Sequence, residues 1–230
     1  MSHGPGGQRL VIFGTSNILS DLFDCAHALG HSIAKIVIHL PEQTGERDLS
    51  LSSRLDALRP LGHDPAVEPF DDFQPGPGEI YLLGPTTPTR SVLADAVEAR
   101  FGLPFATLVH PTAYVSPLAV LRPGVFVGAN SAVGPGARLA RHVFVNRGAT
   151  IGHDTWFGPF CRVQPGSNVG GLSRFGRGVT VGIGATVIER LVIGDGAFIG
   201  AGAVVTKDVA AGEVVVGMKT RDPRLQAADA

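Results

Sequence analysis

The sequence predicts a small α/β domain at residues 1–106 followed by a parallel β-helix at residues 107–218. Three observations lead to this fold class. The 31 glycines and 17 prolines among 230 residues indicate turns at regular intervals. Large apolar residues recur every six positions in the second half, whereas strand and helix spacing alternate in the first half. Residues 1–8 are expected to be disordered, and residues 219–230 to form a C-terminal tail.

The first domain begins with a β-α-β unit. Residues 9–13 are expected to form a short buried strand, and a helix should start near Ile18, capped by Ser16 or Asn17 and ended by Gly30. The later elements expected are a strand at 33–38, a short helix near 51–58, a strand at 80–83 and a helix at 92–101 ended by Gly102. This order predicts a Rossmann-like domain.

The second half repeats every six residues. One phase, from Val109 to Val205, holds an aliphatic residue or Phe at every position, and the position two residues earlier is small or apolar. Because residues i and i−2 of a strand share one face, both should point inward, and Cys161 is therefore interpreted as a core residue. Three hexads should make one coil of a prism, with coils about 4.8 Å apart. Glycine often follows the large residue, as at Gly152 and Gly170, where we expect a positive φ.

Composition and charge exclude several classes of protein. Hydrophobic residues make up 44% and charged residues 17% of the chain, which is too apolar for intrinsic disorder. A formal net charge of -1 predicts no binding to nucleic acid or to an anionic membrane. The chain has neither an apolar signal core nor a run of about 18 apolar residues, so we expect a cytoplasmic location. Cys25 and Cys161 fit neither a disulfide framework nor a zinc site.

His153 is the candidate general base. An exposed histidine is by itself ordinary, but this one stands at a predicted corner, is followed by Asp154, and has Gly171 one coil later. A base beside a residue without a side chain leaves room for a ligand and offers a backbone N–H. Acyl transfer needs that pair, a base for the acceptor and a donor for the developing oxyanion.

A second candidate site lies where the first strand meets the first helix. The stretch Gly14-Thr15-Ser16-Asn17 supplies free backbone N–H groups at a helix N-terminus, which suit a phosphate. It lacks the G-x-G-x-x-G spacing of dinucleotide sites, and an ordinary strand-to-helix turn remains the alternative.

Two columns of residues 18 positions apart should face outward on the prism. One contains Arg138, Trp156 and Arg174, and the other contains Phe126 and Phe144 and ends at Arg162. Exposed aromatic columns on flat faces favour burial against another subunit, with a solvated face as the alternative.

Four stretches of the β-helix resemble the PglD/NeuD-type bacterial sugar acetyltransferases. They are Asn146-Arg-Gly-Ala-Thr-Ile-Gly-His-Asp154, Gly170-Gly171, Val187-Ile-Glu-Arg-Leu-Val-Ile-Gly194 and Ala201-Gly-Ala-Val-Val-Thr-Lys-Asp208. The resemblance implies a left-handed β-helix of hexapeptide repeats, acetyl-CoA as acyl donor, and a nucleotide-sugar acceptor held by the α/β domain beside the catalytic corner. It also implies a homotrimer with the cofactor between adjacent β-helices.

The resemblance assigns roles residue by residue. It implies that His153 is the general base, with Asp154 raising its basicity, and that the catalytic group also includes Asn146 and Gly171. The cofactor-binding residues it implies are Arg162, Gly171, Ile183, Ala201, Lys207 and Lys219. The acceptor-binding residues are expected to be Gly14, Thr15, Ser16, Asn17, His39 and Gly84.

The chain departs from the family at the acceptor loops and elsewhere. Where many members carry a second His there is Arg162, and the C-terminal Gly-x-Pro-Ala is Gly217-Met-Lys-Thr220. The family's Ser-Gly-His loop is Ser16-Asn17-Ile18, and its acidic pair after the second strand is His39-Leu40. We therefore expect a carrier other than the UDP-4-amino sugar of the closest members.

Two other functions are weaker alternatives. A metal hydratase on the same β-helix, similar to γ-carbonic anhydrases, would need three histidine ligands. The repeats contain only His110, His142 and His153, no two of them one coil apart, so no metal is expected. A non-catalytic binding scaffold is the other alternative.

Overall fold

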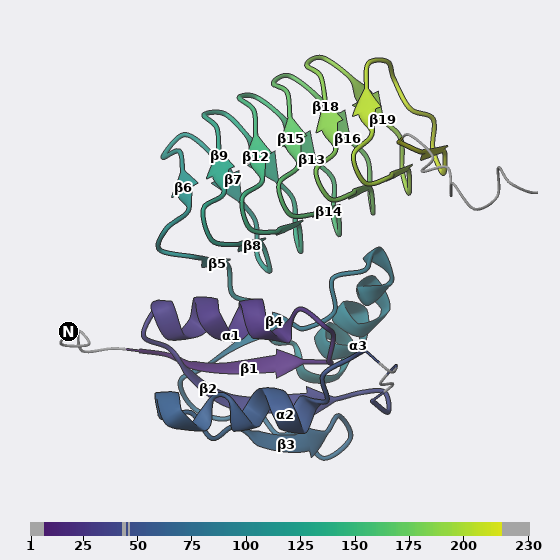
Figure 1. Cartoon of the computed structure of the whole chain (residues 1–230). Helices are drawn as coiled ribbons and strands as arrows, with labels where there is room; N and C mark the ends of the chain where they lie inside the picture. The colour runs from purple at the N-terminus through teal and green to yellow at the C-terminus, as the bar shows by residue number, and fades with distance from the viewer. Residues whose placement is uncertain (1–6, 43–44, 46, 218–230) are drawn as a thin grey trace, which may run out of the picture.

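The computed structural model describes residues 7–42, 45 and 47–217. Residues 1–8 were expected to be disordered, and residues 1–6 of them lie outside the described part of the chain. The expected tail, residues 219–230, lies outside it as well. Two domains follow one another along the chain (Figure 1). The first is a parallel α/β sheet, and the second is a left-handed β-helix.

The α/β domain contains a four-stranded sheet in the order β3-β2-β1-β4. Its strands are β1 (Arg9–Phe13), β2 (Ser32–Ile38), β3 (Ala66–Pro69) and β4 (Glu79–Leu83), and its helices are α1 (Leu19–Ala28), α2 (Leu51–Asp56), the 3-10 turns η1 (Arg59–Leu61) and η2 (Pro88–Arg90), and α3 (Ser91–Phe101). Alternate residues of β1 serve opposite faces, because Leu10 and Ile12 pack with α1, whereas Val11 and Phe13 pack with α3.

Two details of this domain differ from the sequence prediction. Strand β3 was not expected, because it is a short exposed edge strand that ends in a proline. Helix α1 has no side-chain cap. The Ser16 hydroxyl instead donates to the Gly84 carbonyl at 2.8 Å, and the Asn17 amide donates to Asp48 Oδ1 at 2.8 Å. Gly102 ends α3 in the left-handed conformation, as predicted.

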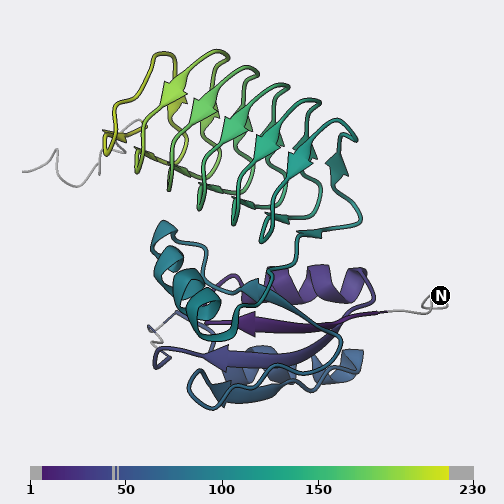
Figure 2. The same ribbon diagram turned by 180° about the vertical axis from the view of Figure 1, so that it is seen from behind.

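The β-helix consists of two-residue strands on three faces of a prism (Figure 2). The first face contains β5 (Leu108–Val109), β8 (Phe126–Val127), β11 (Phe144–Val145), β14 (Arg162–Val163), β17 (Thr180–Val181), β20 (Phe198–Ile199) and β22 (Val214–Val215). The second face contains β6 (Tyr114–Val115), β9 (Ala132–Val133), β12 (Thr150–Ile151), β15 (Asn168–Val169), β18 (Thr186–Val187) and β21 (Val204–Val205). The third face contains β7 (Val120–Leu121), β10 (Arg138–Leu139), β13 (Trp156–Phe157), β16 (Arg174–Phe175) and β19 (Val192–Ile193).

The six-residue phase predicted the core of the β-helix. Each strand from β5 to β18 pairs in parallel with the strand 18 residues later, as Val145 does with Val163, so three hexads make one coil. From Val127 to Val205 every large residue of the phase is buried. Phe157 and Phe175 stack inside the prism with ring centroids 4.1 Å apart.

The expected reason for the glycines after the large residues was wrong. None of them has a positive φ, and the left-handed residue comes three positions after the large one, as at Gly136 and Asp154. The glycines at the strand ends allow close approach between coils instead. A Cβ on Gly152 would lie 2.4 Å from the Gly171 nitrogen, and one on Gly170 would lie 2.5 Å from the Glu189 nitrogen.

The α/β domain covers the earlier strands of the first face. Phe126 and Phe144, which were expected to be exposed, are 2% and 5% exposed and stack at 4.8 Å. They share one apolar cluster with Leu19 and Leu22 of α1. This column is therefore buried within the chain and gives no support for a subunit contact. Trp156, by contrast, is exposed between Arg138 and Arg174 on the third face, in the predicted register.

Among the described residues no helix is long and apolar enough to cross a bilayer.

Candidate active site

The second corner, between the second and third faces, brings His153 and Asp154 together. His153 follows β12, and its Nδ1 lies 2.9 Å from Asp154 Oδ2. The two side chains are 55% and 59% exposed, so a substrate can reach them. Asp154 adopts φ 55°, which turns its carboxylate back toward the ring. A Cβ on Gly136, one coil earlier, would lie 2.2 Å from Asp154 Oδ1, so this glycine makes room for the carboxylate.

Gly171 lies directly over His153, as the 18-residue period predicts. A Cβ on Gly171 would lie 2.6 Å from His153 Nε2. Because Nδ1 bonds to Asp154, Nε2 is the ring nitrogen left for a substrate. Among the described residues the Gly171 N–H donates no hydrogen bond, and the residue is buried against the His153 ring.

Asn146 lies at a different corner of the same chain. It follows β11, at the first corner between the first and second faces, and is 2% exposed. Its Oδ1 accepts from the Arg147 N–H at 2.8 Å, and its Nδ2 donates to Gln164 Oε1 at 3.3 Å. One chain therefore brings His153, Asp154 and Gly171 together but does not bring Asn146 to them.

The residues expected to contact the cofactor also divide between corners. Ile183 and Ala201 are exposed and follow β17 and β20 at the first corner, whereas Lys207 follows β21 at the second corner. Arg162 lies on the first face, and Lys219 lies outside the described residues.

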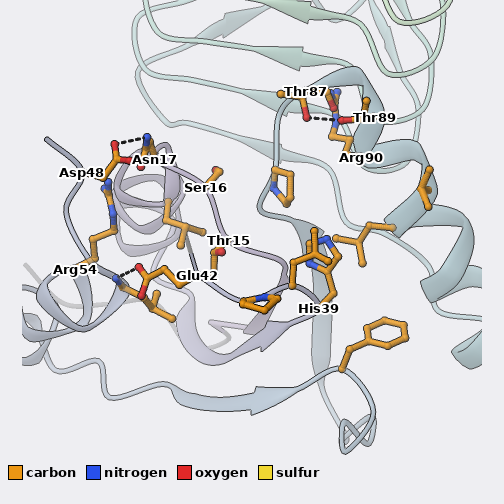
Figure 3. Close-up of a pocket in the computed structure, with 18 of the residues that line it drawn as sticks. Thr15, Ser16, Asn17, His39, Glu42, Asp48, Arg54, Thr87, Thr89 and Arg90 are labelled. Atoms are coloured by element: carbon orange, nitrogen blue, oxygen red, sulfur yellow. Dashed lines mark hydrogen bonds between the residues drawn. The ribbon is translucent and has the colours of Figure 1, made fainter. Parts of the chain in front are cut away.

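A pocket of about 760 Å³ opens at the carboxyl ends of β1, β2 and β4 (Figure 3). Open α/β sheets bind ligands at this edge. The expected residues Thr15, Ser16, Asn17 and His39 line it. Sequence reasoning missed Glu42, Asp48, Arg54, Thr87, Thr89 and Arg90, although the polar segment after β4 stands at the same edge.

The expected glycines lie beneath this pocket and do not line it. A Cβ on Gly84 would lie 2.1 Å from the Gly14 carbonyl oxygen, so a side chain there would separate the loops after β1 and β4. Gly14 has φ +79° and faces His39. Both glycines shape the floor of the pocket through their backbones.

His39 brings a buried ring nitrogen without a hydrogen-bond partner to the pocket. Its Nδ1 is buried and makes no hydrogen bond among the described residues. Burial lowers the pKa of His39, which favours the neutral imidazole. A neutral imidazole offers a ligand one donor nitrogen and one acceptor nitrogen. It cannot replace the carboxylate expected from the family, whose two oxygens both accept hydrogen bonds.

The pocket and His153 lie on opposite sides of the β-helix. The α/β domain packs on the earlier coils of the first face and reaches both adjoining corners, where Arg147 pairs with Asp21 at 2.7 Å and Pro88 approaches Gly178. The second corner stands opposite that face. The pocket and the His153 of one chain therefore face different sides of the prism.

The cysteines are not nucleophiles. Cys161 is fully buried, its thiol donates to the Gly176 carbonyl at 2.9 Å, and burial raises its pKa to about 12. Burial likewise raises the pKa of Cys25 to about 12. In the described part of the chain no group of three His, Cys, Asp or Glu side chains could hold a metal ion.

Comparison with known proteins gives matches among solved structures. No protein-family model and no curated protein matches the sequence. The acetyltransferase domain of PglB from Neisseria gonorrhoeae FA1090, also solved in complex with acetyl coenzyme A, is 26% identical with a TM-score of 0.76, over 92% of this chain and 97% of that one. PerB from Caulobacter crescentus, in complex with CoA and GDP-perosamine, is 26% identical with a TM-score of 0.72, over 94% and 97%.

A third structure shares the fold alone. WeeI from Acinetobacter baumannii AYE is 17% identical with a TM-score of 0.74, over 93% of this chain and 98% of that one. The hexad core, the His153 corner and these similarities agree with one another. The chain is similar over nearly its whole length to sugar acetyltransferases of the hexapeptide-repeat superfamily, and it is an acyltransferase.

Proposed function

We propose that this protein transfers the acetyl group of acetyl-CoA to an amine or hydroxyl of a nucleotide-linked sugar, with His153 as general base. The observation that carries the proposal is the exposed His153–Asp154 pair beneath Gly171, a residue without a side chain. The complexes of the similar PglB domain with acetyl coenzyme A and of PerB with CoA and GDP-perosamine support the two substrates.

The geometry gives each group of the corner a task. His153 Nε2 takes a proton from the acceptor while the acceptor nitrogen or oxygen attacks the thioester carbonyl carbon. The Gly171 N–H stabilises the oxyanion of the tetrahedral intermediate. The C–S bond then breaks, and the imidazolium returns the proton to the CoA sulfur. Asp154, bonded to Nδ1, orients the ring and stabilises the imidazolium.

Substitution of Gly171 tests this arrangement. Gly171→Ala places a Cβ 2.6 Å from His153 Nε2, so the ring must rotate away from its position. The far end of an exposed side chain moves at little cost, and we expect the melting temperature to stay nearly constant. The kcat should fall by about 10–100-fold because the base is displaced. Gly196→Ala, at the corner that follows β19, places its Cβ in open space at a φ of +67° and is the control for a strained glycine change outside the site. An unchanged kcat in Gly171→Ala would contradict the role of this corner.

We further propose a homotrimer in which each site joins two chains. The acceptor pocket and His153 of one chain lie on opposite sides of the prism, and the expected CoA contacts Ile183 and Ala201 lie at the first corner. A neighbouring chain that brings its own pocket and first corner to this His153 would complete the site. Exposed Val120, Trp156 and Val192 on the third face offer apolar surface for that contact.

The proposed acyl donor, acetyl-CoA, indicates the cell compartment in which the protein works. Acetyl-CoA is made and used inside the cell, and we propose a cytoplasmic location on that ground.

The acceptor assay tests the proposed function. Release of CoA from acetyl-CoA should be measured side by side with UDP-, GDP- and dTDP-linked amino sugars. Ile18 and His39 cannot make the contacts of the histidine and carboxylate of the family, and each lost contact weakens binding by about 1–3 kcal/mol. We expect KM for the UDP-4-amino sugar to exceed the best value by about tenfold or more. Protein carrying His153→Ala serves as the blank. A micromolar KM for the UDP-4-amino sugar would contradict the expected specificity, and no CoA release with any acceptor would contradict the function.

A further inference from the structure

Arg162 holds a positive charge on the face that the α/β domain covers. It stands on β14, between Phe144 and Thr180 of the adjoining coils. Its Nε donates to Thr180 Oγ1 at 3.0 Å, and Thr180 is 3% exposed. This bond fixes the direction of the guanidinium group. Among the described residues no carboxylate forms an ion pair with Arg162, and its two Nη groups donate no hydrogen bond.

Arg90 holds a second, deeper charge at the same junction. It is 4% exposed, lines the pocket, and donates to four backbone carbonyls. Two belong to its own loop, those of Thr86 and of Thr87 at 3.0 Å, and two belong to the β-helix, those of His142 and of Cys161 at 3.2 Å. Figure 3 shows Arg90 at the side of the pocket nearest the β-helix. It holds the pocket wall against the third corner, between the third and first faces, to which His142 and Cys161 belong.

The two guanidinium groups lie within electrostatic range of each other. Burial lowers the pKa of Arg90 to about 9, and the nearby Arg162 charge contributes to that lowering. Burial also lowers the pKa of Arg162. Carbonyl dipoles solvate Arg90 without neutralising it, and an unneutralised charge taken out of water is costly. An anion bound at this junction would relieve the cost for both groups. Both Arg90 Nη groups already donate to carbonyls, whereas the Arg162 Nη groups donate no hydrogen bond among the described residues and are left for the contact.

We propose that Arg162 determines acceptor specificity by binding an oxyanion of the acceptor, either a phosphate of its nucleoside diphosphate or a carboxylate of its sugar, with Arg90 as a positioning residue. The inference rests on the proposed function, since it assigns the acceptor to the pocket that Arg90 lines. A planar guanidinium suits both oxyanions, because each offers two oxygens to its paired N–H groups. The sequence motif assigned Arg162 to CoA, but its position beside Arg90 favours the acceptor.

Equilibrium binding by calorimetry on the full chain tests the proposal without catalysis. The probes are UDP, GDP and dTDP, together with two neutral and carboxylated pairs, UDP-glucose with UDP-glucuronate and GDP-mannose with GDP-mannuronate. Arg162→Gln removes the charge, Thr180→Val removes only its anchor, and Arg122→Gln removes an exposed charge elsewhere on the β-helix. A charge-assisted contact predicts a loss of about 10–100-fold in affinity for Arg162→Gln. Thr180→Val should lose about threefold to tenfold, and Arg122→Gln should bind as the natural protein does.

The probes identify the source of the oxyanion. If the best-bound nucleoside diphosphate loses affinity in Arg162→Gln, the phosphate is the group bound. If the diphosphates are unaffected but the carboxylated sugars lose their advantage over the neutral ones, the carboxylate is the group bound. Equal affinities of both proteins for every probe, or no binding of any probe to the natural protein, overturn the proposal. Failure of the proposed function would appear separately, as absence of CoA release by a protein that still binds these probes.

Discussion

Replacing His153 with alanine is expected to lower kcat by about 10²–10⁴-fold while leaving the affinity for acetyl-CoA nearly unchanged. The reason is that Nδ1 bonds to Asp154, which leaves Nε2 as the ring nitrogen that can take a proton from the acceptor. Loss of the base leaves only orientation and the Gly171 N–H to promote the reaction. Steady-state CoA release, with acetyl-CoA binding measured by calorimetry, separates the two quantities.

The neighbouring carboxylate provides a graded comparison. Asp154→Asn keeps a hydrogen-bond acceptor at the ring but removes the negative charge that stabilises the imidazolium. We therefore expect kcat to fall by about tenfold or more. Turnover of His153→Ala near that of the natural protein would remove this histidine from the mechanism.

Mixing two inactive variants is expected to restore activity. One variant carries His153→Ala, and the other carries Thr15→Trp, which fills the acceptor pocket. If each site takes its base from one chain and its pocket from the next, random mixing gives a productive pair at roughly a quarter of the sites. Each variant alone should show almost no CoA release. The measurement is CoA release after the two chains are unfolded together and refolded.

A matched mixture controls for refolding. In it the His153→Ala chain is combined with a chain that carries both substitutions, so no intact pair of base and pocket can form. This mixture should stay inactive. Activity that stays at this background in the first mixture, while refolded natural protein is active, would show that base and pocket belong to one chain.

The β-helix could be predicted from sequence because its repeat is local. Each large residue from Val127 to Val205 is buried by the period itself, and His153 and Gly171 are brought together by one coil of that period. The six-residue period does not identify the corner residue that adopts a positive φ. That residue comes three positions after the large one, and Asp154 shows that it is not always glycine. The prediction of the turn was therefore wrong where the prediction of the core was right.

Contacts between distant segments could not be predicted in this way. The direction of Phe144 was correct, but what covers it depends on α1, more than a hundred residues earlier. Asn146 is close to His153 in sequence and stands at another corner, because each hexad moves the chain to the next face. The role of Arg90 depends on carbonyl groups of His142 and Cys161, which no local pattern connects with it.

The apolar core that α1 shares with the first face makes it costly to exchange the α/β domain for that of a related protein. Phe126 and Phe144 are buried because Leu19 and Leu22 of α1 cover them. The Arg90 guanidinium donates hydrogen bonds to carbonyls of both domains. A recombination event that brought in a new acceptor domain at the 106/107 junction would leave two stacked rings and two carbonyls facing water. New acceptor specificity is therefore more accessible through changes at the pocket rim, such as His39, than through replacement of the domain as a unit.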